Sequence, residues 1–311
     1  MSLITYDLMG NKRDKVQIAI DRLRAFEPPD GYYVAFSGGK DSQCIYHLCE
    51  MAGVKFDAHY RVTSVDPPEL VRFIRKQYPQ VSFDIPHDKD GKPISMWNLI
   101  PRKRFPPTRY MRYCCEILKE SGGRGRLTVT GVRRAESSRR KNNQGMVTIM
   151  ASGAAKIAND NDANYIKTGK RGVVLNYDDS ATRRTVEQCF RTSNTIINII
   201  IDWETEDVWE FLNDVIKVPH CELYDQGYKR LGCIGCPMSN HREQELERYP
   251  KFKAAYLRAF DRMLIERERL GLPTKFKDAQ DVMDWYLEKT PANPCVDGQI
   301  DVSELMDAAE E

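Results

Sequence analysis

Ser37-Gly38-Gly39-Lys40-Asp41-Ser42 decides the fold, because it lies between an apolar strand pattern and a helical pattern. Residues 32–36 form a short apolar run typical of a buried parallel strand. Residues 43–51 repeat apolar side chains at helical spacing and stop at Gly53. A glycine turn between a strand and a helix N-terminus presents backbone N–H groups at the positive end of the helix dipole. The stretch therefore predicts an anion site, with phosphate as its ligand.

The side chains of the same six residues extend this prediction. Lys40 supplies a mobile cation, and Ser37 and Ser42 offer hydroxyl groups. Asp41 is a carboxylate beside an anion site, which indicates a bridging divalent metal such as Mg²⁺. The G-x-x-x-x-G-K-[ST] spacing of a Walker A loop is absent. The alternative to a phosphate site is a Gly-Gly turn that merely joins strand to helix.

The six residues resemble the pyrophosphate loop, SGGKDS, of the adenine-nucleotide alpha-hydrolase-like enzymes, also called the PP-loop superfamily. The resemblance implies that ATP, or an adenylyl sulfate, is handled at its alpha-phosphate. It also implies roles for Lys40 and Asp41 in catalysis and for all six residues in nucleotide binding.

Length and composition set limits on the class of protein. The 311 residues suffice for one large domain or two ordinary ones, and 41% hydrophobic with 30% charged residues is typical of a soluble globular protein. No apolar run reaches membrane-spanning length and the N-terminus lacks a signal-peptide pattern, so we expect a cytoplasmic protein with no membrane partner. The net charge of +2 does not by itself indicate a nucleic-acid binder.

Strand patterns alternate with helical ones along the first two thirds of the chain. The strand patterns cover residues 32–36, 56–62, 81–85, 127–132 and 194–202. This alternation predicts an α/β fold with a Rossmann-like parallel sheet, whose ligands bind at the carboxyl ends of the strands. We expect a nucleotide-binding domain over residues 1–240, with an extended loop or lid at about 142–185. A helical extension is expected over residues 241–311.

Nine cysteines in a chain of this class point to metal or redox chemistry before disulfides. Cys114 and Cys115 are adjacent, while Cys233 and Cys236 form a C-x-x-C pair. Two distant pairs can close a four-thiolate site for zinc or for an iron–sulfur cluster. Adjacent cysteines are awkward ligands for a small tetrahedral zinc site, whereas a larger cluster can span them. A site without metal stays open as well, and Cys189 is an alternative ligand.

Four further segments resemble the phosphoadenosine phosphosulfate reductase family in order and approximate spacing, over roughly residues 15–245. They are RYCCE at 112–116, TGVRRAES at 130–137, IDWETEDVW at 201–209 and LYDQGY at 223–228. In the adenylyl-sulfate branch of that family, a Cys-Cys pair and a later C-x-x-C hold a [4Fe–4S] cluster. The resemblance therefore implies such a cluster on Cys114, Cys115, Cys233 and Cys236.

The chain departs from the reductases of that family in two places. Their C-terminal Glu-Cys-Gly-Leu-His-type segment, which carries a catalytic cysteine, is represented only by Cys295 within Asn293-Pro294-Cys295. The acidic and aromatic sulfate-side motif after the second strand is replaced by residues 62–69. These departures favour relatives without the reductase tail, which include ATP pyrophosphatases that assist sulfur insertion into DNA and more distant enzymes that thiolate transfer RNA.

Two basic segments suit a phosphate-bearing ligand. In the first, cations alternate with aromatic residues, a pattern typical of nucleic-acid binding; it comprises Arg102, Lys103, Arg104, Phe105, Arg109, Tyr110, Arg112 and Tyr113. The second follows the glycine turn at Gly131 and begins with Arg133 and Arg134, which we expect to bind phosphate with that glycine. The simpler interpretation is that these arginines bind ATP or sulfate and decorate a solvated loop.

Three functions remain in view. The first is an ATP-consuming sulfur-transfer enzyme that adenylates its acceptor, releases pyrophosphate and acts on DNA or tRNA with a sulfur-donor protein such as a cysteine desulfurase. The second is an iron–sulfur reductase of adenylyl sulfate, or of its 3′-phosphate, that produces sulfite. The third is a non-catalytic nucleotide-sensing subunit of a larger complex.

Overall fold

The computed structural model describes residues 3–6, 9–168 and 172–288. By their internal contacts these residues fall into two compact units. Unit 1 comprises Met1–Arg61, Glu69–Asp84 and Gly122–Leu231, and unit 2 comprises Val62–Pro68, Ile85–Ser121 and Gly232–Glu311. The division differs from the single expected boundary at residue 240, because two earlier segments also belong to unit 2.

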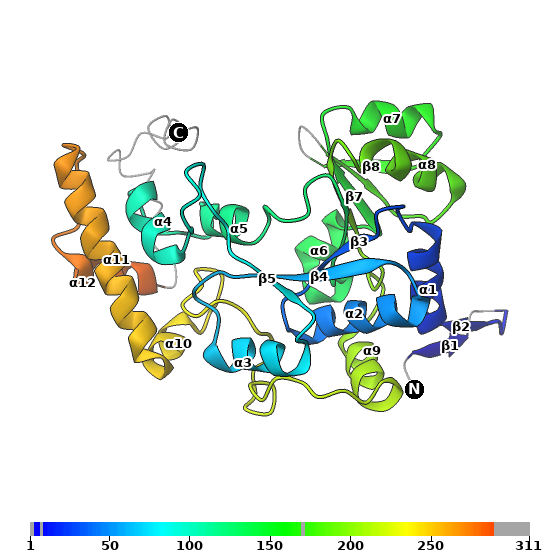
Figure 1. The fold of residues 1–311 in the computed structure, drawn as a ribbon, viewed down its shortest axis with the longest axis horizontal. Coiled ribbons are helices and arrows are strands. Elements are labelled where there is room, and N and C mark those ends of the chain that lie inside the picture. Colours follow the sequence, from blue (N-terminus) through cyan, green and yellow to red (C-terminus); the bar gives the residue numbers. More distant parts are fainter. Residues whose placement is uncertain (1–2, 7–8, 169–171, 289–311) are drawn as a thin grey trace. The chain divides into compact units, whose positions relative to one another are not determined.

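Unit 1 is built on an eight-stranded sheet with the order β5-β4-β3-β6-β10-β7-β9-β8 (Figure 1). Its first five strands pair in parallel and are β5 (Ser82–Asp84), β4 (Phe56–Arg61), β3 (Tyr32–Ala35), β6 (Leu127–Val129) and β10 (Asn194–Ile197). These are the strands expected from the sequence, and they confirm the Rossmann-like α/β class. A separate hairpin of β1 (Ile4–Tyr6) and β2 (Lys12–Asp14) precedes them.

Helices follow the parallel strands as the sequence pattern requires. Helix α1 (Lys15–Ala25) is capped by Asp14, whose carboxylate accepts the N–H groups of Val16 and Gln17. It packs against α2 (Lys40–Ala52), which directly follows the loop after β3 (Figure 1). The other α-helices described in unit 1 are α3 (Pro68–Gln77), α6 (Ser138–Asn143), α7 (Ala154–Asp160), α8 (Ser180–Cys189) and α9 (Thr205–Glu210), and α9 continues into a π-helical turn at Phe211–Val215.

The segment expected to be an extended loop or lid is instead part of the sheet. It contains β7 (Val147–Met150), β8 (Tyr165–Thr168) and β9 (Gly172–Leu175), which add to β10 in antiparallel fashion. These strands are set among polar residues and glycines, so their sequence pattern is weak. The residues of β9 are all buried, which identifies this segment as core rather than lid.

The expected strand over 194–202 ends early, at Ile197. There the backbone turns, and Ile201 and Trp203 donate their N–H groups to the carbonyls of Asn198 and Ile200. Asn198 is only 1% exposed. Its side chain accepts from the Thr130 hydroxyl at 2.5 Å and donates to the carbonyl of Gly145, just before β7. One buried amide therefore joins the parallel part of the sheet to the antiparallel part.

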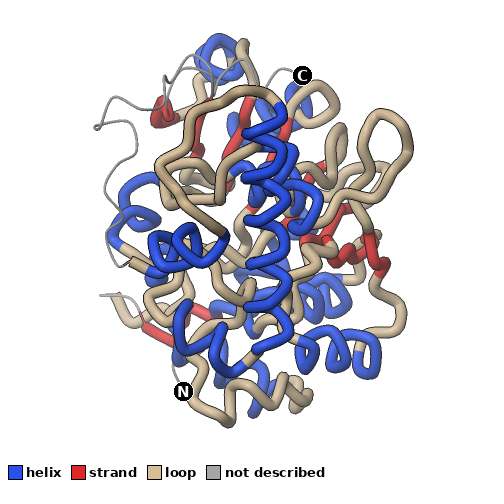
Figure 2. The backbone as a smooth tube through the Cα atoms, turned by 90° about the vertical axis from the view of Figure 1, so that its left-hand side faces the viewer, coloured by secondary structure: helices blue, strands red, loops and turns tan. Residues whose placement is uncertain are grey.

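Unit 2 is helical. It contains α4 (Met96–Lys103), α5 (Tyr113–Leu118), α10 (Arg242–Arg248), α11 (Pro250–Arg269) and α12 (Ala279–Leu287). The long helix α11 packs along α4 and α12 (Figure 1). It is the long helix at the centre of the view in Figure 2. The core between them is apolar and aromatic, and its largest buried members include Leu99, Ile100, Tyr256, Phe260 and Trp285. No helix of the described ranges combines the length and the apolar character needed to span a bilayer.

We predict that Asn198→Ala lowers the free energy of unfolding by about 2–4 kcal/mol, because it leaves the Thr130 hydroxyl and a buried carbonyl without partners. Asn164→Ala, the same change at an exposed position of unit 1, serves as the control and should be neutral. Urea denaturation of both variants measures the difference. Equal stability of the two variants would contradict the role assigned to Asn198.

Candidate functional site

The six-residue loop lies at the carboxyl end of β3, where the sequence predicted a ligand site. Helix α2 begins at Lys40, and Gly39 is its N-cap residue, with extended backbone angles. Gly38 has φ +73°, and a Cβ atom there would lie 2.6 Å from Ile74 Cγ1 and 2.8 Å from Leu70 Cδ1. Both the backbone angle and the available space therefore require glycine at position 38.

The two serine hydroxyls hold the loop closed. Ser42 Oγ donates to the Gly39 carbonyl at 2.8 Å, and Ser37 Oγ donates to Ser42 Oγ at 3.2 Å. These bonds join the start of the loop to the first turn of α2. The loop is therefore shaped by its own side chains as well as by its glycines.

The Asp41 carboxylate lies between two cations. Arg133 Nε approaches one oxygen at 2.7 Å, and Lys40 Nζ approaches the other at 3.1 Å. Both cations are buried, with Arg133 2% and Lys40 6% exposed. Two positive groups and one negative group leave a net positive charge at the N-terminus of α2, which favours an anionic ligand.

Of the three residues predicted to bind phosphate after β6, two reach the loop. A Cβ atom on Gly131 would lie 2.9 Å from the Asp41 carbonyl, so this glycine permits close approach of the chain to α2. Arg133 contacts Asp41 and also donates to the Trp203 carbonyl at 3.3 Å. Arg134 instead donates to the Gln144 carbonyl and to Asn176 Oδ1, so its guanidinium braces the region around β7 and β9.

Tyr224 is a loop contact that residue chemistry and spacing did not single out. The backbone N–H of Lys40 donates to the Tyr224 hydroxyl at 2.9 Å. Burial raises the pKa of Tyr224, so the phenol stays neutral. Its ring meets Trp209 edge-on, at 5.0 Å between centroids. Because 184 residues separate Tyr224 from Lys40, its only sequence signal is its place in the segment LYDQGY.

The four predicted metal-ligating cysteines all belong to unit 2. Cys114 and Cys115 lie in α5, and Cys233 and Cys236 lie in the loop before α10. The pKa of Cys114 is raised, first by its hydrogen bond to Cys115, then by burial, and then by the charges of Cys115, Cys233 and Cys236. The same hydrogen bond, with Arg112 and Lys119 nearby, lowers the pKa of Cys115 to about 5. Cys114 is thus electrostatically coupled to the other three thiols.

Two oxygen groups contact this cysteine site that the sequence did not indicate. Cys233 Sγ lies 3.8 Å from Asp66 Oδ1 and 3.9 Å from Thr63 Oγ1. The Thr63 hydroxyl donates to Asp66 Oδ2 at 2.7 Å. Burial raises the pKa of Cys233 to about 12, although Lys119 opposes the shift. Residues 62–69, which replace the sulfate-side motif of the reductases, thus supply side chains to the cysteine site.

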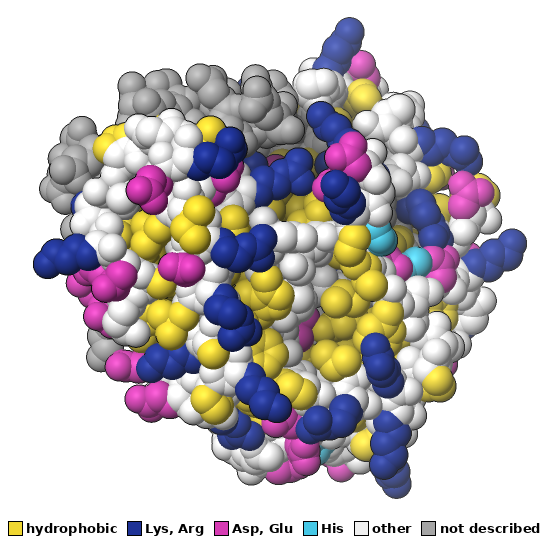
Figure 3. Space-filling model, turned by 60° about the vertical axis from the view of Figure 1, so that its left-hand side comes forward, with side chains coloured by type: hydrophobic (Ala, Val, Ile, Leu, Met, Phe, Trp, Pro, Cys, Tyr) yellow, Lys and Arg dark blue, Asp and Glu magenta, His cyan; other side chains and the backbone are white. Residues whose placement is uncertain are grey.

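Part of the predicted basic and aromatic segment supports the C-x-x-C loop. Arg109 Nε donates to the Pro237 carbonyl at 3.1 Å, and its Nη2 donates to Asn240 Oδ1 at 2.7 Å. The neighbouring Tyr110 is 86% exposed. On the face drawn in Figure 3, lysine and arginine side chains are spread among hydrophobic ones and do not form one continuous patch.

The arrangement of the thiols bears on which metal they could hold. Within the described residues, no group of three or more His, Cys, Asp or Glu side chains is placed to hold a metal ion. A [4Fe–4S] cluster holds its four thiolates around a larger body than a single zinc ion. The alternative ligand Cys189 is buried in α8 of unit 1. Cys295 lies outside the described residues.

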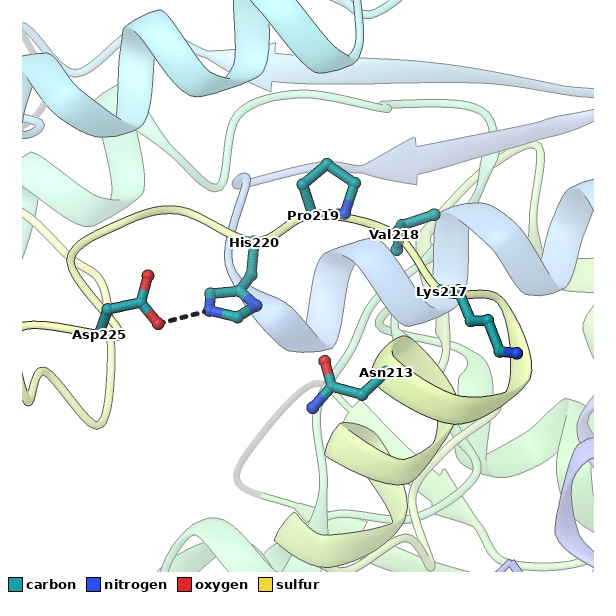
Figure 4. Close-up of a pocket in the computed structure, with 6 residues that line it drawn as sticks. All are labelled: Asn213, Lys217, Val218, Pro219, His220 and Asp225. Atoms are coloured by element: carbon teal, nitrogen blue, oxygen red, sulfur yellow. Dashed lines mark hydrogen bonds and ion pairs between the residues drawn. The ribbon is translucent and has the colours of Figure 1, made fainter.

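An open pocket of about 530 Å³ lies on the segment that leads to Tyr224 (Figure 4). Its lining residues are Asn213, Lys217, Val218, Pro219, His220 and Asp225. His220 Nε2 pairs with Asp225 Oδ1 at 2.9 Å, and the His220 ring meets Trp209 and Tyr224 edge-on. The Pro219 carbonyl accepts from the Gln43 amide of α2 at 2.9 Å. This segment is therefore bonded to the helix that follows the loop.

Comparison with known proteins places these features in a family. The sequence profile of the phosphoadenosine phosphosulfate reductase domain matches residues 31–239. An uncharacterized protein of Methanocaldococcus jannaschii is 23% identical over 271 residues, which are 80% of this chain and 54% of that protein. The chain thus spans about half the length of that relative. The adenosine 5′-phosphosulfate reductase of Oceanobacillus iheyensis is 46% identical over 37 residues, 12% of this chain and 15% of that enzyme.

We predict that Gly38→Ala destabilises the protein more than Gly53→Ala does. Both glycines flank α2 with positive φ, +73° and +68°, so alanine costs about 1–2 kcal/mol at either. A Cβ atom at Gly53 meets no atom within 4 Å, whereas at Gly38 it overlaps Ile74 and Leu70, which adds about 1–3 kcal/mol. Denaturant unfolding measures both, and equal losses would refute the packing constraint on the loop.

Proposed function

The chain belongs to the phosphoadenosine phosphosulfate reductase family, within the PP-loop superfamily, and on that premise we propose that it binds ATP at residues 37–42 and adenylates an acceptor for sulfur transfer. The observation that carries this proposal is the buried group of Lys40, Asp41 and Arg133 at the N-terminus of α2. Its net positive charge and the backbone donors of the loop suit a polyphosphate.

In the proposed reaction an oxygen atom of the acceptor attacks the alpha-phosphorus of ATP. The bond between that phosphorus and the bridging oxygen breaks, and pyrophosphate leaves with the electron pair. The acceptor oxygen becomes part of an AMP ester, and a sulfur nucleophile then displaces AMP. Lys40 and Arg133 stabilise the charge that develops on the phosphate oxygens.

Mg²⁺ enters this proposal with the nucleotide. It is held in such sites by one or two carboxylates together with substrate phosphates and water. Asp41 is the carboxylate of the loop, and each of its oxygens already contacts a cation. If one Asp41 oxygen coordinates Mg²⁺, its contact with Lys40 or Arg133 weakens. That cation can then turn toward the phosphates.

For the cysteine site we propose a [4Fe–4S] cluster on Cys114, Cys115, Cys233 and Cys236. Support comes from the electrostatic coupling of Cys114 to the other three thiols and from the place of all four in unit 2. A bound cluster supplies redox-active iron that can also coordinate sulfur. Around it, Thr63 and Asp66 offer oxygen atoms beside Cys233, and Arg109 braces the loop that carries Cys236.

We propose a nucleic acid, DNA or tRNA, as the acceptor, with a sulfur-donor protein as partner. The support is the exposed aromatic Tyr110 among basic residues of the first basic segment.

A reductase of adenylyl sulfate that produces sulfite is the second candidate, favoured by the short match to the Oceanobacillus enzyme. Pyrophosphate released from ATP in response to a nucleic acid supports the first function, and sulfite released with a thiol reductant supports the second. ATP binding without turnover would support a nucleotide-sensing subunit.

We predict that Lys40→Ala lowers ATP turnover by about 100-fold or more, because a buried cation at the developing phosphate charge is lost. The fold should persist, since Asp41 keeps its contact with Arg133. Pyrophosphate release measures turnover, and circular dichroism checks the fold. Lys156→Ala, at an exposed position of α7, is the control and should retain full turnover. Unchanged turnover in Lys40→Ala would remove the loop from the reaction.

We predict about four iron atoms and four acid-labile sulfides per chain in protein purified without oxygen. Cys233→Ala should lose both, whereas Cys189→Ala, which removes a buried thiol of unit 1, should retain both. Zinc is measured in parallel. Zinc in place of iron, absence of metal, or loss of iron in Cys189→Ala alone would contradict the ligand set.

A further inference from the structure

The first backbone donor of α2 is already occupied by a side chain of the same unit. The first N–H groups of a helix have no partner within the helix, and they are the groups that bind phosphate at a helix N-terminus. In this protein the Lys40 N–H donates to the Tyr224 hydroxyl at 2.9 Å. A Cβ atom on Gly39 would lie 3.4 Å from the same hydroxyl. The Tyr224 hydroxyl therefore lies beside Gly39, the N-cap residue of α2.

Tyr224 is held there by aromatic contacts and by a turn. Its ring meets Trp209 at 5.0 Å and 90°, and His220 at 6.0 Å and 73°. Its backbone N–H donates to the Cys221 carbonyl, and its carbonyl accepts from Gly227. His220 also lines the open pocket of Figure 4, so one side of this aromatic group borders open volume.

We propose that the Tyr224 hydroxyl is a resident acceptor that a nucleotide phosphate oxygen replaces on the Lys40 N–H. The proposal rests on the ATP site proposed above. An anionic phosphate oxygen accepts a hydrogen bond about twice as strong as one to a neutral oxygen, so the exchange is favourable. Nucleotide binding nevertheless forfeits the bond to Tyr224. The hydroxyl thus lowers the affinity for nucleotide, and it also satisfies the Lys40 N–H.

Several contacts that shape the loop do not involve the Tyr224 hydroxyl. Gly38 packs against Ile74 and Leu70, Ser42 bonds the Gly39 carbonyl, and Asp41 is fixed by two cations, all without the Tyr224 hydroxyl. The Tyr224 ring, over which Lys40 Nζ lies at 6.0 Å from the centroid, is kept in Tyr224→Phe. Removal of the hydroxyl should therefore free the Lys40 N–H without disordering its neighbours. Removal of the hydroxyl therefore distinguishes two roles of Tyr224. If the hydroxyl competes with the nucleotide, its removal strengthens nucleotide binding, whereas if it only supports the loop, its removal weakens nucleotide binding.

The test is the dissociation constant of alpha,beta-methylene ATP with Mg²⁺, measured by calorimetry on the full chain and on Tyr224→Phe. Tyr224→Phe should bind the analogue about two- to tenfold more tightly, which is the value of one neutral hydrogen bond. Tyr177→Phe, a change at an exposed tyrosine of unit 1, should leave the affinity unchanged. Equal or weaker binding by Tyr224→Phe would overturn the proposal, weaker binding meaning that the hydroxyl donates to the nucleotide.

Amide hydrogen exchange at Lys40 gives a second readout that needs no nucleotide. Tyr224→Phe should exchange this amide faster than the wild-type chain does, and an unchanged rate would overturn the proposal. If the wild-type chain binds the analogue as tightly as Tyr224→Phe or more tightly, only the role of Tyr224 is refuted. Absence of binding to the wild-type chain and to both variants refutes the ATP site, and the role of Tyr224 with it.

Discussion

The contact of the Asp41 carboxylate with Lys40 and Arg133 is the constraint on which the candidate nucleotide site depends. A guanidinium that is 2% exposed is costly to bury without an anionic partner, and Asp41 is that partner at 2.7 Å. The contact ties the first turn of α2 to the chain that follows β6. Gly131 allows the two backbones to approach, because any side chain there would collide with Asp41. The contact of Asp41 with Lys40 and Arg133 therefore determines both the position of the loop and the positive charge that it offers to a ligand.

The two candidate sites differ in how the chain builds them. The loop belongs to unit 1, where a strand, a turn and a helix follow one another in sequence. The cysteine site belongs to unit 2, which is assembled from three segments, the first two beginning directly after β4 and β5. One segment brings Thr63 and Asp66, the next Cys114 and Cys115, and the last the C-x-x-C pair. Because these segments start from different strands, the cysteine ligands can come together only when the strands of the sheet are correctly ordered.

This difference explains what the sequence could predict. The loop was predictable because its strand, glycines and helix are local, and the parallel strands because their apolar runs are long enough to stand out. The strands over residues 147–175 were missed, because polar residues and glycines surround them and leave little periodic signal. Tyr224 and Thr63 escaped chemical reasoning, because their contacts join distant segments of the chain. Such contacts follow from topology, which the spacing of residues along the sequence does not contain.

The arginines show a further limit of reasoning from composition. A cluster of cations suggests a phosphate ligand, yet Arg109 and Arg134 direct donors to carbonyl and amide oxygens of the protein itself. Arg133 gives its Nε to Asp41 and one terminal nitrogen to a backbone carbonyl. The same guanidinium cannot bind a protein oxygen and a phosphate with the same N–H group, so the charge offered to a ligand is smaller than the number of arginines suggests. Binding of a nucleotide then depends on Lys40, on the part of the Arg133 charge that Asp41 does not neutralise, and on the backbone donors of the loop, whose positions the glycines fix.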